Sequence, residues 1–126
     1  MKSNLRNITD IPTELIHNNT TLRKRLVSTD EHHTGDIATM NYAWLEPKKQ
    51  LDIHTHIDGE EFYFFLEGTG QMLVGEEWLP VTKDDFVIVP AATNHSVKNN
   101  TDKNLVFLTI RTQQATNNTD IMNIVP

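Results

Sequence analysis

The sequence predicts an all-β domain, built as an antiparallel sandwich or barrel. Three observations favour this fold class: eight or nine short segments rich in β-branched and aromatic residues, turn-forming residues between them at close spacing, and almost no segment with helical periodicity. The 126 residues suffice for one domain but are too few for two, and a hydrophobic fraction of 37% is ordinary for a globular protein.

The chain divides into three parts. Residues 1–21 are polar and weakly patterned, so we expect a partly irregular N-terminal segment with one short helical turn over Thr9–Ile16, where Pro12 is tolerated near the start. Residues 22–112 carry the strand pattern and form the barrel. Residues 113–126 form a polar tail with an apolar patch near its end, which either packs on a protein surface or stays disordered.

The expected strands follow one another along the barrel region. The run 62–66 is apolar on both faces, as in a strand that is buried on both sides. Gly75-Glu76-Glu77 predicts a hairpin between two neighbouring strands. The full set of expected strands is 22–27, 37–45, 51–57, 62–66, 71–74, 78–81, 86–89, 95–98 and 105–112.

Composition excludes several classes of protein. The net charge is −6, from 11 Lys and Arg against 17 Asp and Glu, which argues against nucleic acid or an anionic membrane as a partner. The chain has no cysteine, hence no disulfide framework and no thiolate metal site. It shows neither an apolar signal-peptide run nor the ~20 apolar residues of a membrane helix, so we expect a cytoplasmic protein.

Three histidines and one glutamate form a candidate metal site. His54 and His56 are two residues apart in the alternating run 51–57, so both imidazoles lie on one face of a strand, although such a pair alone is more typical of a solvent-facing strand. Glu61 leads into an apolar strand, where an unpaired charge is costly to bury and a shared metal ion compensates it. His95 opens a later strand and can close the site from across a barrel.

These residues resemble the two sequence motifs of the cupin superfamily. The first motif, G-x5-H-x-H-x3-4-E-x6-G, is matched by His54-Thr55-His56, Glu61 and Gly68. The second, G-x5-P-x-G-x2-H-x3-N, is matched by Pro90, His95 and Asn99. Together the motifs span residues 48–99, and the flanking strands extend the resemblance to about residues 22–112.

The chain departs from these motifs at three glycine positions, which hold Lys48, Asp84 and Ala92. Glycine serves turn geometry there, because it freely adopts positive φ angles, so the substitutions put the local loop shape in question and remove no metal ligand. Glu60 competes with Glu61 as the carboxylate ligand, and the six residues that separate Glu61 from Gly68 favour Glu61.

The resemblance implies a fold, a metal and a set of partners. The fold is a double-stranded β-helix (the cupin or jelly-roll antiparallel barrel) of the small single-domain, conserved-barrel type. It implies one divalent metal ion per chain on His54, His56, Glu61 and His95, with Mn or Fe favoured and Ni or Zn possible. Single-domain cupins commonly pair through their sheets, so we expect a homodimer.

The same fold hosts many chemistries, so function stays a hypothesis. We expect a metal-dependent enzyme acting on a small organic molecule, first a dioxygenase, then an isomerase or decarboxylase. The alternatives are a non-catalytic cupin that binds or senses a small ligand such as a sugar, and a domain in which the metal is only structural.

No catalytic residue is fixed by the sequence, and Tyr63 and Arg111 are the candidates. Arg111 shares a strand face with Phe107 and Thr109, so it either binds an anionic substrate inside the barrel or lies at the solvated rim. His17 is expected at the surface. Several large side chains can line a pocket above the metal, although core packing is the favoured role: Met40, Tyr42, Trp44, Tyr63, Phe65 and Met72.

Overall fold

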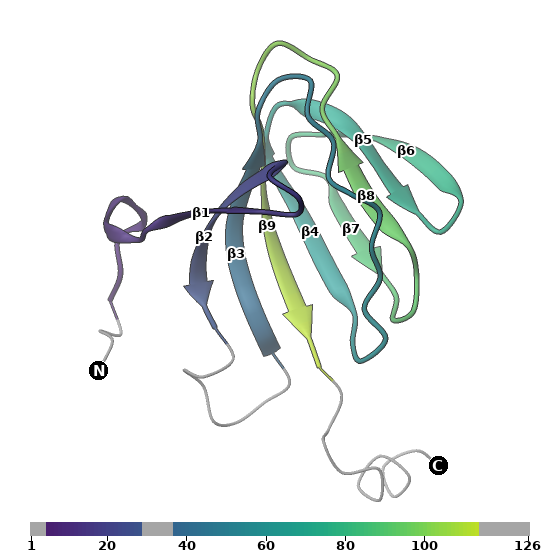
Figure 1. Ribbon diagram of the computed structural model, residues 1–126. Helices are drawn as coiled ribbons and strands as arrows, with labels where there is room; N and C mark the ends of the chain where they lie inside the picture. The colour runs from purple at the N-terminus through teal and green to yellow at the C-terminus, as the bar shows by residue number, and fades with distance from the viewer. Residues whose placement is uncertain (1–4, 29–36, 114–126) are drawn as a thin grey trace, which may run out of the picture.

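The computed structural model describes residues 5–28 and 37–113, and within them nine strands form two antiparallel sheets that face each other (Figure 1). The larger sheet has the order β1-β2-β3-β9-β4-β7, and the smaller has the order β6-β5-β8. The strands are β1 (Thr13–Ile16), β2 (Thr21–Val27), β3 (Ile37–Leu45), β4 (Glu61–Glu67), β5 (Thr69–Val74), β6 (Glu77–Thr82), β7 (Phe86–Val89), β8 (His95–Lys98) and β9 (Leu105–Thr112).

The core lies between the two sheets and follows from the period-2 alternation of the strands. Along β3, Asn41, Ala43 and Leu45 are buried, while Tyr42 and Trp44, which lie between them, are half-buried on the outer face. Both sheets contribute to a single cluster of buried side chains: Ala43, Leu45, Leu51, Tyr63, Phe65, Met72, Val81, Val89, Val97, Leu105 and Phe107. The predicted all-β class is confirmed, and so is the hairpin, in which Gly75 and Glu76 form the turn between β5 and β6.

The expected strand over 51–57 is not a regular strand. The segment and the preceding Gln50 pair with the edge strand β8 in two isolated bridges only, Gln50 with Lys98 and His54 with His95. Leu51 is buried, but Ile53 and Ile57, on the same predicted face, are 55% and 77% exposed. The alternation is present in the sequence, but the chain leaves the sheet edge after His54, so the apolar face is not covered.

The N-terminal segment also differs from expectation. A 3-10 turn, η1 (Ile8–Asp10), is capped by the side chain of Asn7, and the predicted turn over Thr9–Ile16 is wrong for its second half, which forms β1. Ile11 is extended at ψ 128°, as is usual before a proline, and this ends the turn. The larger sheet thus begins at Thr13, ahead of residue 22; the tail from 114 onward lies outside the described residues.

The outer face of β4 is less covered than the sequence predicts. Phe62 and Phe64 are only half-buried, because β4 has no layer on its outward side. Phe62 stacks on Phe86 at 5.9 Å between ring centroids, and Phe86 and Ile88 are themselves 57% and 53% exposed. The prediction of a strand buried on both sides is therefore wrong for the outer side in a single chain.

The three motif positions that lack glycine keep a glycine-like backbone. Lys48, Asp84 and Ala92 have φ angles of 65°, 75° and 58°. A non-glycine residue in this region costs on the order of 1 to 3 kcal/mol, so the surrounding hydrogen bonds must hold the turns in place. Gly68, at φ 86°, cannot be replaced by another residue in the same way, since a Cβ there would lie 2.5 Å from the Asn104 carbonyl oxygen.

Candidate metal centre

The structure brings the four predicted ligands together where the two sheets meet. Glu61 is the first residue of β4 in the larger sheet, and His95 is the first residue of β8 in the smaller one. His54 and His56 lie on the segment that borders β8. The potential donor atoms of all four side chains lie within 4.8 Å of one another. The site therefore depends on the packing of one sheet against the other.

Backbone hydrogen bonds fix the histidine-bearing segments. His54 and His95 exchange both bonds of an antiparallel bridge, with N···O distances of 3.1 and 2.9 Å. This bridge brings the two imidazole rings to a centroid separation of 4.1 Å. The carbonyl of His56 accepts from the Ala92 amide at 2.7 Å, so the left-handed turn at Ala92 ties the second imidazole to the loop that precedes His95.

Two of the imidazoles have their proton position fixed. His54 Nδ1 lies 2.9 Å from the Asp52 carbonyl oxygen, and His95 Nδ1 lies 2.9 Å from the Thr93 carbonyl oxygen. A carbonyl can only accept, so each Nδ1 carries the hydrogen and donates it. In the neutral ring this leaves the Nε2 lone pair free, which is the usual arrangement in a metal-ligating histidine.

The Glu61 carboxylate meets two of these imidazoles. Its Oε1 lies 3.0 Å from His95 Nε2 and 3.4 Å from His56 Nε2. Because His95 Nδ1 already holds a hydrogen, a neutral His95 would direct a lone pair at a carboxylate oxygen, and this contact requires a cation between them, either a proton or a metal ion. The donor set of imidazole nitrogen and carboxylate oxygen fits a divalent transition metal.

The charge states of the site favour ligation. Burial raises the pKa of Glu61, but hydrogen bonds and charges from His56 and His95 outweigh it and hold the pKa at about 2. Burial lowers the pKa of His54 to about 4, despite its bond to the Asp52 carbonyl. At neutral pH Glu61 is therefore ionised and His54 is neutral, the forms in which both side chains bind metals.

His17 lies at the site rather than at the open surface. Residues 17–19 all have positive φ angles in the turn between β1 and β2, and this turn sets the His17 ring 4.5 Å from the His54 ring. His17 Nδ1 bonds Asp52 Oδ1 at 3.1 Å, and its side chain is 28% exposed. The expectation of a surface histidine is wrong because a turn remote in sequence folds over the histidine pair.

Glu60 is exposed and does not belong to the cluster. Its backbone amide bonds Thr112 Oγ1 at 2.9 Å, at the start of the β4 pairing with β9. Asn99, from the second motif, is fully buried and structural: its side-chain amide donates to the carbonyls of Leu45 and Lys103, and its oxygen accepts from Thr101.

A cavity of about 270 Å³ opens beside the cluster, between the inward faces of β2, β3 and β9. Both candidate catalytic residues line it. Tyr63 Oη lies 3.4 Å from Glu61 Oε1, and burial together with the Glu61 charge raises the pKa of Tyr63 well above its usual range. Arg111 is 31% exposed and its Nη2 donates to Asp58 Oδ1 at 2.9 Å, so it lies at the cavity wall.

Two lining residues, Arg23 and Arg25, are not among the residues singled out from the sequence. They are two positions apart on β2 and alternate with the outward side chains of Leu22 and Lys24. Their i, i+2 spacing after the buried Thr21 is the signal that marks an inward face. The full lining is Ile16, His17, Thr21, Arg23, Arg25, Thr39, Asn41, Ala43, Leu51, His56, Glu61, Tyr63, Phe107, Thr109 and Arg111.

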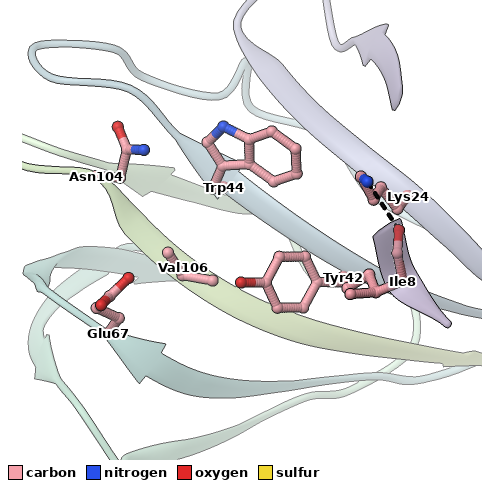
Figure 2. Close-up of a pocket in the computed structure, with 7 residues that line it drawn as sticks. All are labelled: Ile8, Lys24, Tyr42, Trp44, Glu67, Asn104 and Val106. Atoms are coloured by element: carbon pink, nitrogen blue, oxygen red, sulfur yellow. Dashed lines mark hydrogen bonds between the residues drawn. The ribbon is translucent and has the colours of Figure 1, made fainter. Parts of the chain in front are cut away.

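The remaining pocket candidates lie elsewhere. Phe65 and Met72 belong to the buried core cluster, which confirms core packing as their predicted role. Tyr42 and Trp44 lie on the outer face of the larger sheet, where their rings approach edge-on at 6.0 Å and border a separate hollow of about 320 Å³ (Figure 2). At its end, Lys24 Nζ donates to the Ile8 carbonyl at 2.7 Å. The hollow is lined by Ile8, Lys24, Tyr42, Trp44, Glu67, Asn104 and Val106.

Comparison with known proteins decides the family. A family model of the cupin domain matches residues 42–111, which is more than half of the chain. The chain is a member of the cupin superfamily. A stretch of 47 residues is also 38% identical to an uncharacterized protein of Methanocaldococcus jannaschii, and this alignment covers 37% of the chain and 38% of that protein.

Solved structures with the same cupin fold have low sequence identity to the chain. A predicted oxalate decarboxylase of Thermotoga maritima has a TM-score of 0.80 at 21% identity, covering 86% of this chain and 98% of its own. The polyketide cyclase RemF of Streptomyces resistomycificus has a TM-score of 0.73 at 17% identity, covering 88% and 80%. A Cupin 2 conserved barrel domain protein of Salinispora arenicola has a TM-score of 0.69 at 16% identity, covering 98% and 97%. These similarities establish the double-stranded β-helix and leave the reaction open.

Within the described ranges, no helix is long and apolar enough to cross a membrane.

Proposed function

We propose that this cupin is a metal-dependent enzyme that acts on a small organic molecule, with His54, His56, Glu61 and His95 holding one divalent ion. The observation that carries the proposal is the contact between Glu61 Oε1 and His95 Nε2, which requires a cation while Nδ1 of the same ring donates to a carbonyl. A proton alone satisfies one such contact. A metal ion accounts for the convergence of all four donors within 4.8 Å.

The ligand set supports a range of metal-dependent reactions. Mn or Fe is favoured, with Ni or Zn possible, and when bound such an ion supplies Lewis-acid polarisation of substrate oxygens and, for Mn or Fe, oxidation by O2. A dioxygenase is the first choice and an isomerase or decarboxylase the next. The structural relatives named for a decarboxylase and a polyketide cyclase support this range of chemistry and do not select within it.

The chain's own residues would bind and orient the substrate. Tyr63 keeps its proton at neutral pH, so Oη, which donates to Glu61 Oε1 at 3.4 Å, acts as a hydrogen-bond donor and not as a base. A substrate oxygen would compete with Glu61 for this hydrogen. Leu51 and Phe107 form an apolar wall of the cavity beside this hydroxyl and limit the water around a bound molecule. Glu61 is committed to the histidine cluster, which leaves it no free proton-transfer role.

The test is elemental analysis of protein purified without added metal, run beside His54→Ala and Glu61→Ala. About one Mn, Fe, Ni or Zn per chain, lost in both variants, is expected and selects the reactions to assay. Glu60→Ala is the matched control, because it removes an exposed carboxylate one residue away and should retain the ion. A wild-type protein that takes up none of these ions after reconstitution would contradict the proposal and favour a non-catalytic barrel that binds a small ligand such as a sugar.

We propose further that the chain forms a homodimer through the outer face of the larger sheet. The exposed Phe86 and Ile88 lie beside the half-buried Phe62 and Phe64, an apolar surface that a second copy would cover. Light scattering of the wild type and of Phe86→Lys tests this: a dimer that becomes a monomer in the variant supports it, and a wild-type monomer at high concentration contradicts it.

A further inference from the structure

The arginines of this protein are concentrated in one place. The sequence contains four arginines and seven lysines. Three of the four arginines, Arg23, Arg25 and Arg111, line the cavity beside the candidate metal centre, and none of the lysines does. Such a distribution in a chain of net charge −6 indicates that the cavity requires the guanidinium group and not just positive charge.

Strand register places the three guanidinium groups around the same space. Arg23 and Arg25 line the cavity from β2, where they pair with Ala43 and Asn41 of β3 and their side chains are 23% and 41% exposed. Arg111 lines it from β9, opposite Thr39. Lys24, between the two β2 arginines, points to the outer face and binds the Ile8 carbonyl. A single strand thus separates its basic residues by type, with the two arginines on the face that lines the cavity and the lysine on the opposite face.

The carboxylates already present do not neutralise the site once an ion is bound. Glu14 accepts from Arg23 Nε at 3.2 Å and from Arg25 Nη2 at 3.0 Å, and Asp58 pairs with Arg111. Glu61 is a third negative charge, and Asp52, which bonds the cavity-lining His17 at 3.1 Å, is a fourth, against three guanidinium groups and a divalent ion. The remaining excess of one positive charge, in a partly enclosed cavity, favours an anionic ligand.

Arg111 is also held at a cost to stability. Its Nε is buried and has no hydrogen-bond partner within the described part of the chain, and the same is true of Asn41 Oδ1 on the neighbouring strand. An unpaired buried donor on a charged group is unfavourable, and a hydrophobic side chain of similar size would avoid it. The position of Arg111 is better explained by what its guanidinium binds than by what it contributes to folding.

We propose that this cavity binds a small organic acid, with a carboxylate group held by Arg23, Arg25 and Arg111 beside the candidate metal centre. The inference rests on the proposed function for the place of the ion and adds the class of substrate. Planar guanidinium groups match carboxylates in two-point contacts, as Arg25 does with both oxygens of Glu14. A cavity of about 270 Å³ limits the acid to a small one.

The experiment is calorimetric titration of metal-loaded protein with malonate, succinate and glutarate, each beside its neutral diamide, and with inorganic phosphate. We expect at least one acid to bind and its diamide to bind at least roughly tenfold more weakly, because the amide offers no charge to the guanidinium groups. Arg111→Gln and Arg23→Gln should each weaken that acid by roughly 10- to 100-fold. Lys24→Gln is the matched control, with the same loss of charge on the outer face of the same strand, and should leave the affinity unchanged.

Metal content, measured on the same samples, separates this inference from the proposed function. If the protein holds its ion but binds no acid better than the diamide, or binds only phosphate, the organic-acid inference is wrong and the metal-dependent enzyme stands. If the protein holds no ion but binds an acid through the arginines, the inference stands and the metal proposal fails. Equal loss in Lys24→Gln and Arg111→Gln would also overturn the inference, since it would indicate a general charge effect.

Discussion

The inward faces of β3 and β9 change character halfway along their length. Toward one end, Leu45 pairs with Leu105 and Ala43 with Phe107, and all four side chains are buried in the core. Toward the other end, Asn41 pairs with Thr109 and Thr39 with Arg111, and these side chains line the cavity. The two halves share strands, alternation and register, yet one is apolar and the other holds polar groups beside the metal ligands.

Regular strand pairing and side-chain chemistry are therefore separable in this barrel. The apolar half supplies the buried area that stabilises the fold. The polar half contains an unpaired Asn41 oxygen and an unpaired Arg111 nitrogen among the described residues, both of which disfavour folding. Three predictions test this division, in order of decreasing effect on stability.

Phe65→Ala should lower the free energy of unfolding by about 3 to 5 kcal/mol, because Phe65 of β4 is fully buried opposite Phe107 of the apolar half and the substitution leaves a cavity. Urea denaturation measures the loss, and Phe65→Leu should lose much less. The variant should still take up a metal ion while folded. If Phe65→Ala abolished ion uptake in the folded protein, the two halves would not be separable.

In the metal-free protein, lowering the pH should destabilise the fold through His54 and Glu61, the candidate metal ligands beside the polar half. His54 has a folded pKa of about 4, below its ordinary 6.5, so the unfolded chain takes up a proton that the folded chain resists, and stability falls as the pH drops from 6.5 toward 4. Glu61, at about 2 against an ordinary 4.5, adds a loss of about 3 kcal/mol between pH 4.5 and 2.

Unfolding free energies measured across this range should therefore fall in both windows. The lower window should flatten in Glu61→Gln, which cannot titrate there. A stability profile of the wild type that is level from pH 6.5 to 2 would contradict the charge states assigned to the site.

The double substitution Asn41→Leu with Thr109→Val should change stability by no more than about 1 kcal/mol, in either direction. It removes both partners of the 3.2 Å Asn41–Thr109 hydrogen bond and also the unpaired Asn41 oxygen. Thr109→Val alone should be worse than the pair, because it leaves the Asn41 amide without its acceptor. Thermal unfolding of the three proteins decides, and a large loss in the double variant would show that the polar half contributes to folding.

Much of the barrel could be predicted from local sequence. The bounds of β3, β7, β8 and β9 match the expected strands, because β-branched and aromatic residues alternate between clear turn signals. The four residues of the candidate centre could be singled out because two spaced motifs agree. The segment 51–57 shows the limit of this reasoning: it alternates as a strand does, but alternation does not reveal whether a partner strand lies alongside.

The rest of the site depends on contacts remote in sequence. Arg23 and Arg25 face the cavity only because β2 pairs with β3 in one register, and a shift by one residue would send them to the outer face. His17 reaches His54 through the turn between β1 and β2, and β1 falls in a region where the sequence predicts a helical turn. Neither the arginine lining nor the His17–His54 contact can be predicted without knowing which strands pair and in which register.

The left-handed turns at Lys48, Asp84 and Ala92 bear on how relatives of this protein are found. Glycine is the residue that most easily adopts a positive φ angle, but the turn needs the backbone conformation and not glycine itself. A search pattern that demands glycine at these three places would reject this chain, although its backbone adopts there the positive φ angles that glycine favours. Patterns that weight the ligands and tolerate other residues at the turns would recover such divergent members.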